Sequence, residues 1–319
     1  MNKNVAIGLL VVLLIALVGF MLKDMMSTET QDVNPYSYEL DDYKSIDSSK
    51  ICYSEIKRFN IDIENLRAVS VDDNDNIYLA GNGRVIILDK DFNLKSTFNV
   101  EGENYAMTIS KSGLIYLSKR THIEVWNDNG ELVKSWEAFN EKSFLTSIAL
   151  KEDQVFVADA GNKSMLKYSV DGNFIKEIGK RNKETGEKGF FIPSPYFDVA
   201  LGRNGEIWAV NSGYHQLEAF NQEGEKFSSW KKTSMQWDGF SGCCNPSNIA
   251  LLSNGSFVTS EKGLVRIKIH APNGDFICAV ATPNEFEDGV SGIDLAVDSN
   301  DNIYAIIPQT NELRVYNKL

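Results

Sequence analysis

The sequence predicts an all-β fold, a six-bladed β-propeller of four-stranded antiparallel blades, preceded by a single N-terminal transmembrane helix. Three observations support this prediction: an apolar run near the N-terminus, short β-branched and aromatic segments separated by Asn, Asp and Gly, and a phrase that recurs six times. Short apolar segments bounded by turn residues are the pattern of strands. A chain of 319 residues with 43% apolar side chains can form one large all-β domain.

The first expected element is the apolar run Val5–Leu22, which is flanked by Lys3 and Lys23. Its 18 residues are just long enough to cross a bilayer as a helix. A cleaved signal peptide would have a shorter apolar region and small residues at a cleavage site, which this segment lacks. We therefore expect residues 1–23 to be an uncleaved membrane anchor, with the rest of the chain on the extracytoplasmic, periplasmic side.

The second expected element is a tether. Residues 24–50 are polar and acidic and show neither helical nor strand periodicity. Such a composition cannot bury enough apolar surface to fold by itself. The propeller is then expected to occupy residues 51–319.

The blades are predicted from internal repetition. A turn residue followed by three mostly apolar residues recurs around Ile77, Ile115, Val155, Ile207, Phe257 and Ile303. Before each copy comes a short strand with a small residue between two aliphatic ones, and these small residues are Ser70, Thr108, Ala149, Ala200, Ala250 and Ala296. Small side chains suit innermost strands that crowd around a channel. Repeats of about 45 residues that each contain four strands are typical of propeller blades.

The last blade needs a strand from elsewhere, because the sixth copy ends after its third strand. An open sheet edge would expose unpaired backbone groups. We expect residues 51–59 to supply the missing outer strand and to close the ring.

The third unit, VFVADAGNKSMLKYSVDGNFIKEIG, resembles the NHL repeat, and the other five units are looser versions of it. The resemblance covers Ile51–Leu319 and implies a six-bladed propeller. The segment Gly239–Val280 is also similar to bacterial membrane-anchored NHL-like proteins with no assigned activity. In lactonases and amidating lyases with similar propellers, metal ligands lie two places before the first aliphatic residue of each inner strand. Here those places hold Arg67, Tyr105, Thr146, Phe197, Ser247 and Ile293. None is His, Asp or Glu, which argues against both enzyme types.

A polar cluster is expected one place nearer to the inner strands, where Asp198, Asn248 and Asp294 stand. These side chains are candidates for binding a ligand or a divalent cation in the channel. The alternative is structural, because an Asp at this position can accept hydrogen bonds from turn amides.

Two long connections are expected on the same face as Arg67 and Tyr105, namely Lys180–Tyr196 and Lys231–Pro246. Long loops on a rigid scaffold often carry binding residues. The aromatic candidates for such a face are Phe190, Phe191, Tyr196, Trp237 and Phe240. They serve either as anchors for a partner or as a cover over the end of the channel.

The cysteines allow several interpretations. Cys243 and Cys244 are adjacent, and they form a structural turn with or without a bond, a soft-metal site, or a redox pair. Cys52 and Cys278 fall in outer strands of neighbouring blades, where we expect two separate buried thiols.

The remaining charged candidates are expected to be structural. Glu261, Lys262 and Arg266 form a secondary charged cluster in blade five, interpreted as solvated ion pairs of little energetic weight. His270 replaces a repeated aromatic residue and is expected to pack, whereas His122 and His215 are expected at the surface. The three histidines occupy different places in their units, which excludes a zinc site built from all of them.

The composition narrows the function. A net charge of −12 argues against nucleic acid as a partner. The leading hypothesis is a membrane-anchored, extracytoplasmic and monomeric binding or scaffolding module for a peptide, glycan or protein partner. One alternative is a hydrolase or lyase of the lactonase-like type, in which Asp198, Asn248 and Asp294 hold a divalent cation and Arg67 polarises the substrate. A second alternative is a redox-responsive protein that uses Cys243 and Cys244. No cofactor is expected, with a divalent cation in the channel left open.

Overall fold

The computed structural model describes residues 3–26, 40–184 and 186–319. The chain divides into two compact units, Met1–Glu39 and Leu40–Leu319. In the first unit, the apolar run forms the helix α1 (Lys3–Met26). Among the helices of the described residues, none meets the combined requirement of length and apolarity for crossing a membrane. The membrane anchor predicted for Val5–Leu22 is thus present as a helix but has no support as a membrane span.

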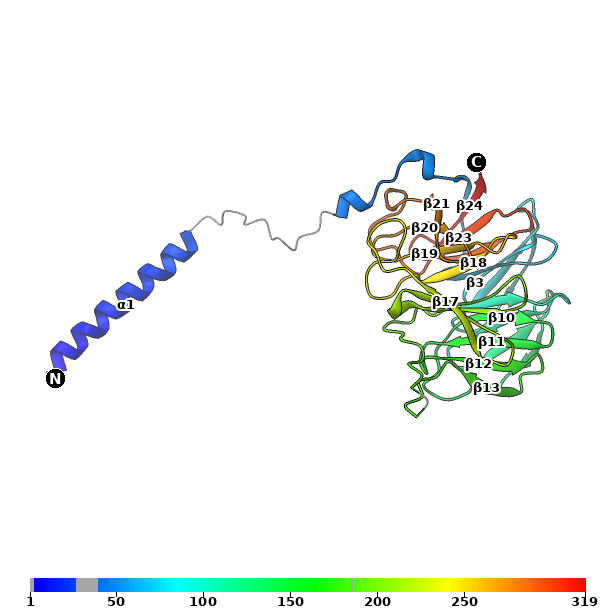
Figure 1. Ribbon diagram of the computed structural model, residues 1–319, viewed down its shortest axis with the longest axis horizontal. Coiled ribbons are helices and arrows are strands. Elements are labelled where there is room, and N and C mark those ends of the chain that lie inside the picture. Colours follow the sequence, from blue (N-terminus) through cyan, green and yellow to red (C-terminus); the bar gives the residue numbers. More distant parts are fainter. Residues whose placement is uncertain (1–2, 27–39, 185) are drawn as a thin grey trace. The chain divides into compact units, whose positions relative to one another are not determined.

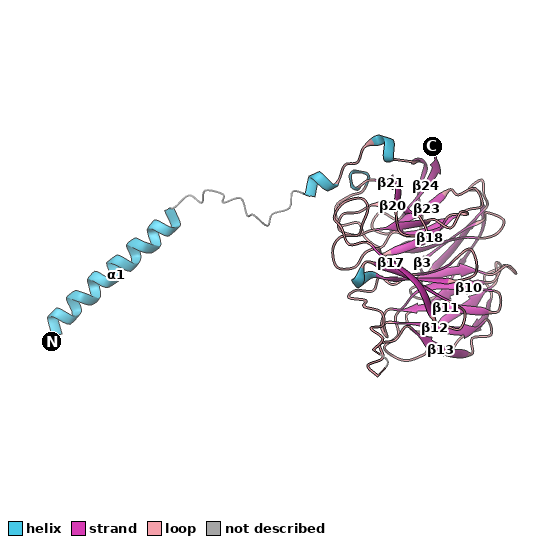
Figure 2. Ribbon diagram, in the orientation of Figure 1, coloured by secondary structure: helices cyan, strands magenta, loops and turns pink. Residues whose placement is uncertain are grey.

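The second unit is the predicted propeller of six four-stranded antiparallel blades (Figures 1 and 2). Blade one contains β2 (Glu64–Val71), β3 (Ile77–Asn82), β4 (Arg84–Leu88) and β5 (Leu94–Asn99). Blade two contains β6 (Ala106–Ile109), β7 (Ile115–Ser118), β8 (Ile123–Trp126) and β9 (Leu132–Ser135). Blade three contains β10 (Leu145–Lys151), β11 (Gln154–Asp159), β12 (Ser164–Ser169) and β13 (Phe174–Ile178).

The later blades include two short 3₁₀ turns. Blade four contains β14 (Val199–Leu201), β15 (Ile207–Asn211), η3 (Ser212–Tyr214), β16 (Gln216–Phe220) and β17 (Lys226–Lys231). Blade five contains β18 (Asn248–Leu251), β19 (Phe257–Ser260), β20 (Ile267–His270) and β21 (Phe276–Ala281), and is followed by η4 (Pro283–Glu285). Blade six contains β22 (Asp294–Val297), β23 (Ile303–Ile307), β24 (Glu312–Lys318) and β1 (Tyr53–Asn60).

Blade six joins the two ends of the propeller sequence. β1 runs antiparallel to β24, with Tyr53 opposite Lys318 and Asn60 opposite Glu312. β1 therefore supplies the outermost strand of this blade, in the region of the chain where the sequence predicts it. Without it, the backbone of β24 would be an open edge.

The six inner strands surround a channel of about 270 Å³. The small residues that recur in the sequence line it, as predicted, and they are Ser70, Thr108, Ala149, Ala200, Ala250 and Ala296. Aliphatic neighbours on the same strands, such as Val69 and Ile249, are buried between the blades. The alternation of small and aliphatic residues thus narrows the channel while filling the core between the sheets.

A glycine contact recurs at the joints between consecutive blades. Gly172, in the turn before β13, has a φ of +80°, and a Cβ placed on it would lie 2.5 Å from Cδ1 of Trp136 in blade two. Gly274, with a φ of +86°, meets Trp230 of blade four in the same way, at 2.6 Å. Only glycine combines this backbone conformation with so close an approach. The turn glycines therefore act as sockets for the outer-strand apolar residue of the preceding blade.

The segment before β1 is attached to blade five. It contains the short 3₁₀ turns η1 (Leu40–Tyr43) and η2 (Ser48–Lys50), and the carbonyl oxygen of Ser45 accepts a hydrogen bond of 2.9 Å from Nε1 of Trp237. Of the predicted tether, residues 24–50, residues 24–26 belong to α1, residues 27–39 lie outside the described residues, and the part from residue 40 docks on the propeller.

Cys52 and Cys278 form a disulfide, so the prediction of two separate thiols is wrong. The bridge occurs because Ile51 pairs with Ala279 and the amide of Cys52 donates to the Ala279 carbonyl, 3.1 Å away. These contacts bring the residue that precedes β1 alongside β21. The closing strand β1 is thus held to blade six by backbone hydrogen bonds and to blade five by the disulfide.

Candidate functional site

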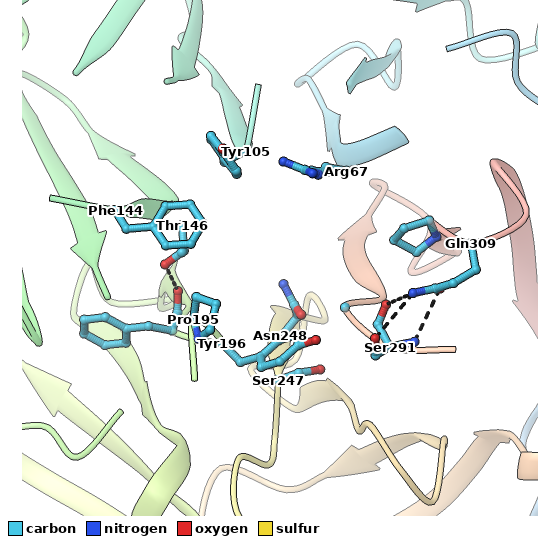
Figure 3. Close-up of a pocket in the computed structure, with 13 residues that line it drawn as sticks. Arg67, Tyr105, Phe144, Thr146, Pro195, Tyr196, Ser247, Asn248, Ser291 and Gln309 are labelled. Carbon is cyan, nitrogen blue, oxygen red and sulfur yellow. Dashed lines mark hydrogen bonds between the residues drawn. The ribbon is translucent and has the colours of Figure 1, made fainter. Parts of the chain in front are cut away.

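A cavity of about 420 Å³ opens at the end of the channel where the inner strands begin (Figure 3). We call this cavity the mouth pocket. It is lined by Arg67, Tyr105, Phe144, Thr146, Pro195, Tyr196, Phe197, Ser247, Asn248, Ser291, Gly292, Pro308 and Gln309. Most of these residues lie at or just before the start of an inner strand. Five of the six positions that the analogy with lactonases and amidating lyases marks for metal ligands therefore face this pocket, and they hold Arg67, Tyr105, Thr146, Phe197 and Ser247.

One wall of the mouth pocket is formed by two adjacent aromatic rings with an arginine at each end of the row. The Arg67 guanidinium carbon lies 4.8 Å from the Tyr105 ring centroid, and the Tyr105 ring meets Phe144 edge-on at 4.8 Å. Arg120 lies over the other ring of this pair, with its guanidinium carbon 5.1 Å from the Phe144 centroid. Figure 3 shows Arg67 and Tyr105 side by side, with Asn248 facing them across the cavity. Stacking fixes the orientation of each cation without using its hydrogen-bond donors.

Glu103, at the rim, offsets the positive charge of Arg67 on this wall. Its carboxylate lies 3.3 Å from Arg67 Nη2 and accepts a hydrogen bond from the Tyr105 hydroxyl. These contacts, first with Tyr105 and then with Arg67, lower the pKa of Glu103, while burial raises the pKa of Tyr105. Because both Arg67 and Glu103 remain partly exposed, an incoming anion can compete with Glu103 for the guanidinium.

The other walls combine apolar residues with hydrogen-bonded polar side chains. Nε2 of Gln309 donates to the carbonyl oxygen and the hydroxyl of Ser291, at 3.1 and 3.3 Å. Thr146 Oγ1 donates to the carbonyl oxygen of Phe197 at 2.6 Å. These hydrogen bonds, drawn in Figure 3, hold the polar side chains in place before any ligand arrives.

Deeper in the channel, Asp198 and Asp294 act as tethers between blades. Asp198 Oδ2 accepts a 2.6 Å hydrogen bond from the amide of Ile249 in blade five. Asp294 Oδ2 accepts one of 2.9 Å from the amide of Val69 in blade one. Each carboxylate therefore uses an oxygen to bind an amide of the next inner strand, whereas the structural interpretation of these residues expected turn amides.

Both carboxyl groups hold their protons more tightly than usual. Burial raises the pKa of Asp198 to about 6, and burial together with the neighbouring charge of Asp198 raises the pKa of Asp294 to about 7. Nδ2 of Asn248 donates to Asp294 Oδ1 at 3.3 Å, or, with the amide turned over, to the carbonyl oxygens of Ile293 and Ser247. The turned amide presents its oxygen to Asp294, which suits the protonated acid.

The predicted aromatic face is divided between core and surface. Phe190, Trp237 and Phe240 are buried, so they are not available as exposed anchors. Phe191 is 45% exposed, and Tyr196 is half-buried at the edge of the mouth pocket. The long loops fold back onto the blades, because Phe190 fills the space beside Phe197 and Phe220 in blade four.

The charged cluster of blade five is buried, so its prediction as a solvated network is wrong. Arg266 and Lys268 are 0% exposed, and both bind Glu261, with N–O distances of 2.9 and 2.8 Å. The loop that contains Trp237 and Phe240 covers the cluster and stacks its rings on the two cations. Burial lowers the pKa of Lys268 to about 8. Removing one of the three charged side chains would leave a buried charge without its partner, which is strongly destabilising. The network therefore holds the covering loop in place.

Lys262 does not belong to the buried cluster. Its ammonium nitrogen lies 4.8 Å from the ring centroid of Tyr196, and it therefore adds a third cation to the aromatic rim of the mouth pocket. His270 is packed among Trp230 and Phe240, as expected, and burial lowers its pKa to about 3. Cys243 and Cys244 are free thiols with their sulfur atoms 3.2 Å apart.

Several residues of the mouth pocket were missed by the sequence-based candidates. Phe144, Ser291 and Gln309 line it, and Arg120 supports it from behind. Aligning the six units position by position could have identified Phe144. It lies three places before Ser147, the residue that aligns with Asp198, Asn248 and Asp294 in the other units. Gln309 lies in the turn between the second and third strands of blade six, where no shared pattern identifies it.

No protein-family model matches the chain, and no curated protein matches it significantly. The NHL resemblance therefore stays a prediction.

Solved structures with the same fold include a streptogramin B lyase, at a TM-score of 0.59 and 11% identity over 86% of this chain and 100% of that one. Virginiamycin B lyase from Staphylococcus aureus matches at a TM-score of 0.58 and 12% identity, covering 84% and 100%. The WD40 β-propeller domain of Doa1 matches at 0.56 and 14%, covering 79% and 78%. At such identities the likeness shows the propeller fold alone.

Proposed function

We propose that this propeller is a binding module and that the mouth pocket recognises a short segment of a partner protein that carries a carboxylate, such as an acidic side chain or a chain end. The observation that carries the proposal is the row formed by Arg67, Tyr105, Phe144 and Arg120. It presents the oriented guanidinium of Arg67 to the cavity beside ring faces, with Arg120 behind Phe144, in a protein whose net charge of −12 otherwise repels anions.

The polar groups of the mouth pocket suit a peptide backbone. Gln309 and Thr146 are held by hydrogen bonds within the rim, and the Asn248 amide faces the cavity from blade five. A ligand carboxylate would displace Glu103 from Arg67 and form charge-assisted hydrogen bonds in its place. Propellers can recognise partners in this way without moving, because the loops are fixed by the blades.

The test is a binding screen by fluorescence polarisation, with short peptides that bear free acidic groups and with their amidated counterparts. Acidic peptides are expected to bind, and Arg67→Gln is expected to weaken them about tenfold or more through the lost charge-assisted bonds. The matched control is Arg203→Gln, since Arg203 lines a different cavity on the opposite face. Equal binding of acidic and amidated peptides, or equal loss in both variants, would contradict the proposal. Binding of acidic oligosaccharides alone would point to a glycan ligand.

The alternative of a cation-dependent hydrolase or lyase has weaker support. Asp198 and Asp294 each commit an oxygen to a backbone amide of the next blade. Within the described residues, no group of three or more His, Cys, Asp and Glu side chains is placed to hold a metal ion. Retention of a stoichiometric divalent cation after gel filtration, lost in Asp294→Asn, would favour this enzyme over the binding module.

We also propose that the propeller lies outside the cytoplasm. The disulfide between Cys52 and Cys278 supports this location, because such bonds persist in oxidising compartments. Trapping thiols with an alkylating agent at the moment of cell lysis should leave both cysteines unlabelled. Quantitative labelling of Cys52 would contradict the location.

A further inference from the structure

The thiols of Cys243 and Cys244 form a pair of unequal accessibility in the loop before β18. Their sulfur atoms are 3.2 Å apart; Cys243 is exposed, whereas Cys244 is 1% exposed. A disulfide requires an S–S distance of about 2.05 Å and usually Cα atoms at least about 4.4 Å apart, whereas adjacent Cα atoms lie about 3.8 Å apart. Bonding of the two sulfurs therefore needs a change of the local backbone as well as a movement of the side chains. One thiol is thus placed to meet a reagent from solvent, and the other is placed to react with the first.

The backbone on both sides of the pair is held in place. Asn245 is buried, and its side-chain nitrogen Nδ2 donates to the carbonyl oxygens of Ser241 and Lys262 at 2.6 and 3.0 Å. Its side-chain oxygen accepts from the amide of Lys262 at 2.9 Å. On the other side, the Gly242 carbonyl oxygen lies 2.5 Å from His215 Nε2. The short sulfur separation is therefore a property of a fixed loop.

The buried thiol is connected to the wall of the mouth pocket. The buried hydroxyl of Ser194, which has no hydrogen-bond partner among the described residues, opposes the rise that burial causes in the pKa of Cys244. The next two residues, Pro195 and Tyr196, line the mouth pocket. Lys262 also acts on Cys244, and its ammonium group lies over the Tyr196 ring.

The pair is also connected to the mouth pocket along the chain. Ser247 and Asn248, which line the mouth pocket, follow Cys244 closely in sequence. A change at the sulfur atoms therefore reaches the pocket by two routes. One runs in space from Asn245 through its hydrogen bonds to Lys262, whose side chain lies over Tyr196, and the other runs along the backbone through Pro246.

We propose that Cys243 and Cys244 are a vicinal dithiol that exchanges with small disulfides, and that its oxidation reshapes the wall formed by Ser194–Tyr196 and Ser247. The Cys243 thiolate attacks one sulfur of a disulfide RSSR, forms a mixed disulfide and releases RS⁻. Cys244 then gives its proton to solvent, attacks the Cys243 sulfur and expels the second RS⁻. Two thiols are oxidised to one disulfide while RSSR is reduced to two thiols. This site is independent of the ligand proposed for the mouth pocket.

The experiment exposes the full-length chain to oxidised glutathione and follows free thiols and intact mass. The wild type is expected to lose two thiols and about 2 Da, with both sulfurs recovered in one proteolytic peptide. Cys243→Ser should stay unmodified, because its remaining thiol is buried. Cys244→Ser should stop at an adduct that carries one glutathione. Two persistent thiols in the wild type, or a stable glutathione adduct on it, would overturn the dithiol.

Amide hydrogen exchange tests the connection to the mouth pocket. Oxidation is expected to change exchange in residues 194–197 and 246–248, whereas residues 123–135 in blade two serve as the reference that stays constant. The Cys243→Ser variant, treated in the same way, should show no change in either region. Formation of the disulfide with unchanged exchange at 194–197 would overturn the reshaping of the wall and leave only the exchange chemistry. Thermal unfolding of each variant confirms that the substituted chains are folded.

Discussion

The joint between blades three and four differs from the joint between blades six and one. The first lies within a continuous chain, and its contacts include Gly224 against Ile178 and Ser147 against Val199. The second joins residues more than two hundred positions apart, and there Asp294 binds Val69 while Asp75 accepts two hydrogen bonds from Ser299, of 2.9 and 2.7 Å. The chain crosses this second joint only through β1, which leads directly into β2, so the side-chain hydrogen bonds there connect strands from opposite ends of the propeller sequence.

The largest expected effect comes from removing the closing strand. Deletion of residues 51–60 removes β1 together with Cys52, and leaves β24 as an open edge. We expect the sharp unfolding transition to disappear, as measured by circular dichroism during heating. Deletion of residues 3–26, which belong to the other compact unit, is the control and should leave the transition in place. An equally sharp transition in both truncated chains would show that the closing strand is dispensable.

The disulfide should have the next largest effect. It closes a loop with a sequence separation of 226 residues, so its loss increases the freedom of the unfolded chain. We expect the double variant Cys52→Ser, Cys278→Ser to lose about 2–5 kcal/mol of unfolding free energy in urea. The matched control is Cys243→Ser, Cys244→Ser. If the control variant loses as much unfolding free energy, the loss is a general effect of replacing cysteine by serine and does not come from the missing disulfide.

The joints inside the continuous chain can be weakened at their glycine sockets. Gly172→Ala combines a strained φ with a clash against Trp136, and should cost about 1–3 kcal/mol. Gly102→Ala separates the two causes, because Gly102 has a φ of +76° and open space around its Cβ position. A smaller loss in Gly102→Ala is therefore expected by urea unfolding. Equal losses would assign the whole effect to the backbone.

The closing joint should also respond to pH through Asp294. Its folded pKa of about 7 lies above that of an unfolded Asp, so between about pH 4 and pH 7 the folded chain holds a proton that the unfolded chain has lost. The free energy of unfolding should then fall as the pH rises through this window and level off above it. Asp294→Asn removes this contribution. The advantage of the wild type over the variant should decrease by about 1–3 kcal/mol from pH 4.5 to pH 8. A constant or increasing advantage would contradict the raised pKa.

The periodic part of the molecule is the part that the sequence predicts. The small residues of the inner strands, the six units and the closing strand all follow from repetition, because each unit must form the same sheet and face the same channel. Arg67 and Tyr105 were placed at the mouth by their register alone.

The non-periodic part could not be predicted in this way. Phe190, Trp237 and Phe240 stand in long loops, and a loop sequence does not reveal whether it projects outward or folds back. Glu261 and Arg266 are buried because such a loop covers them, so the prediction that they are solvated was wrong, and Lys268, which joins them, was not among the predicted residues. The pairing of Cys52 with Cys278 depends on an isolated bridge to Ala279 before β1. Each error concerns a contact between segments that share no repeat.

The attachment of the N-terminal segment determines how the propeller would respond to a mechanical pull from that end. Tension on Leu40 would reach the Trp237 contact at Ser45 and then the disulfide at Cys52 before it reached β1. The load would pass sideways into blade five, and the hydrogen bonds between β1 and β24 would be shielded from unzipping one after another. The propeller could then stay closed under tension that is applied through the same chain end that supplies its closing strand.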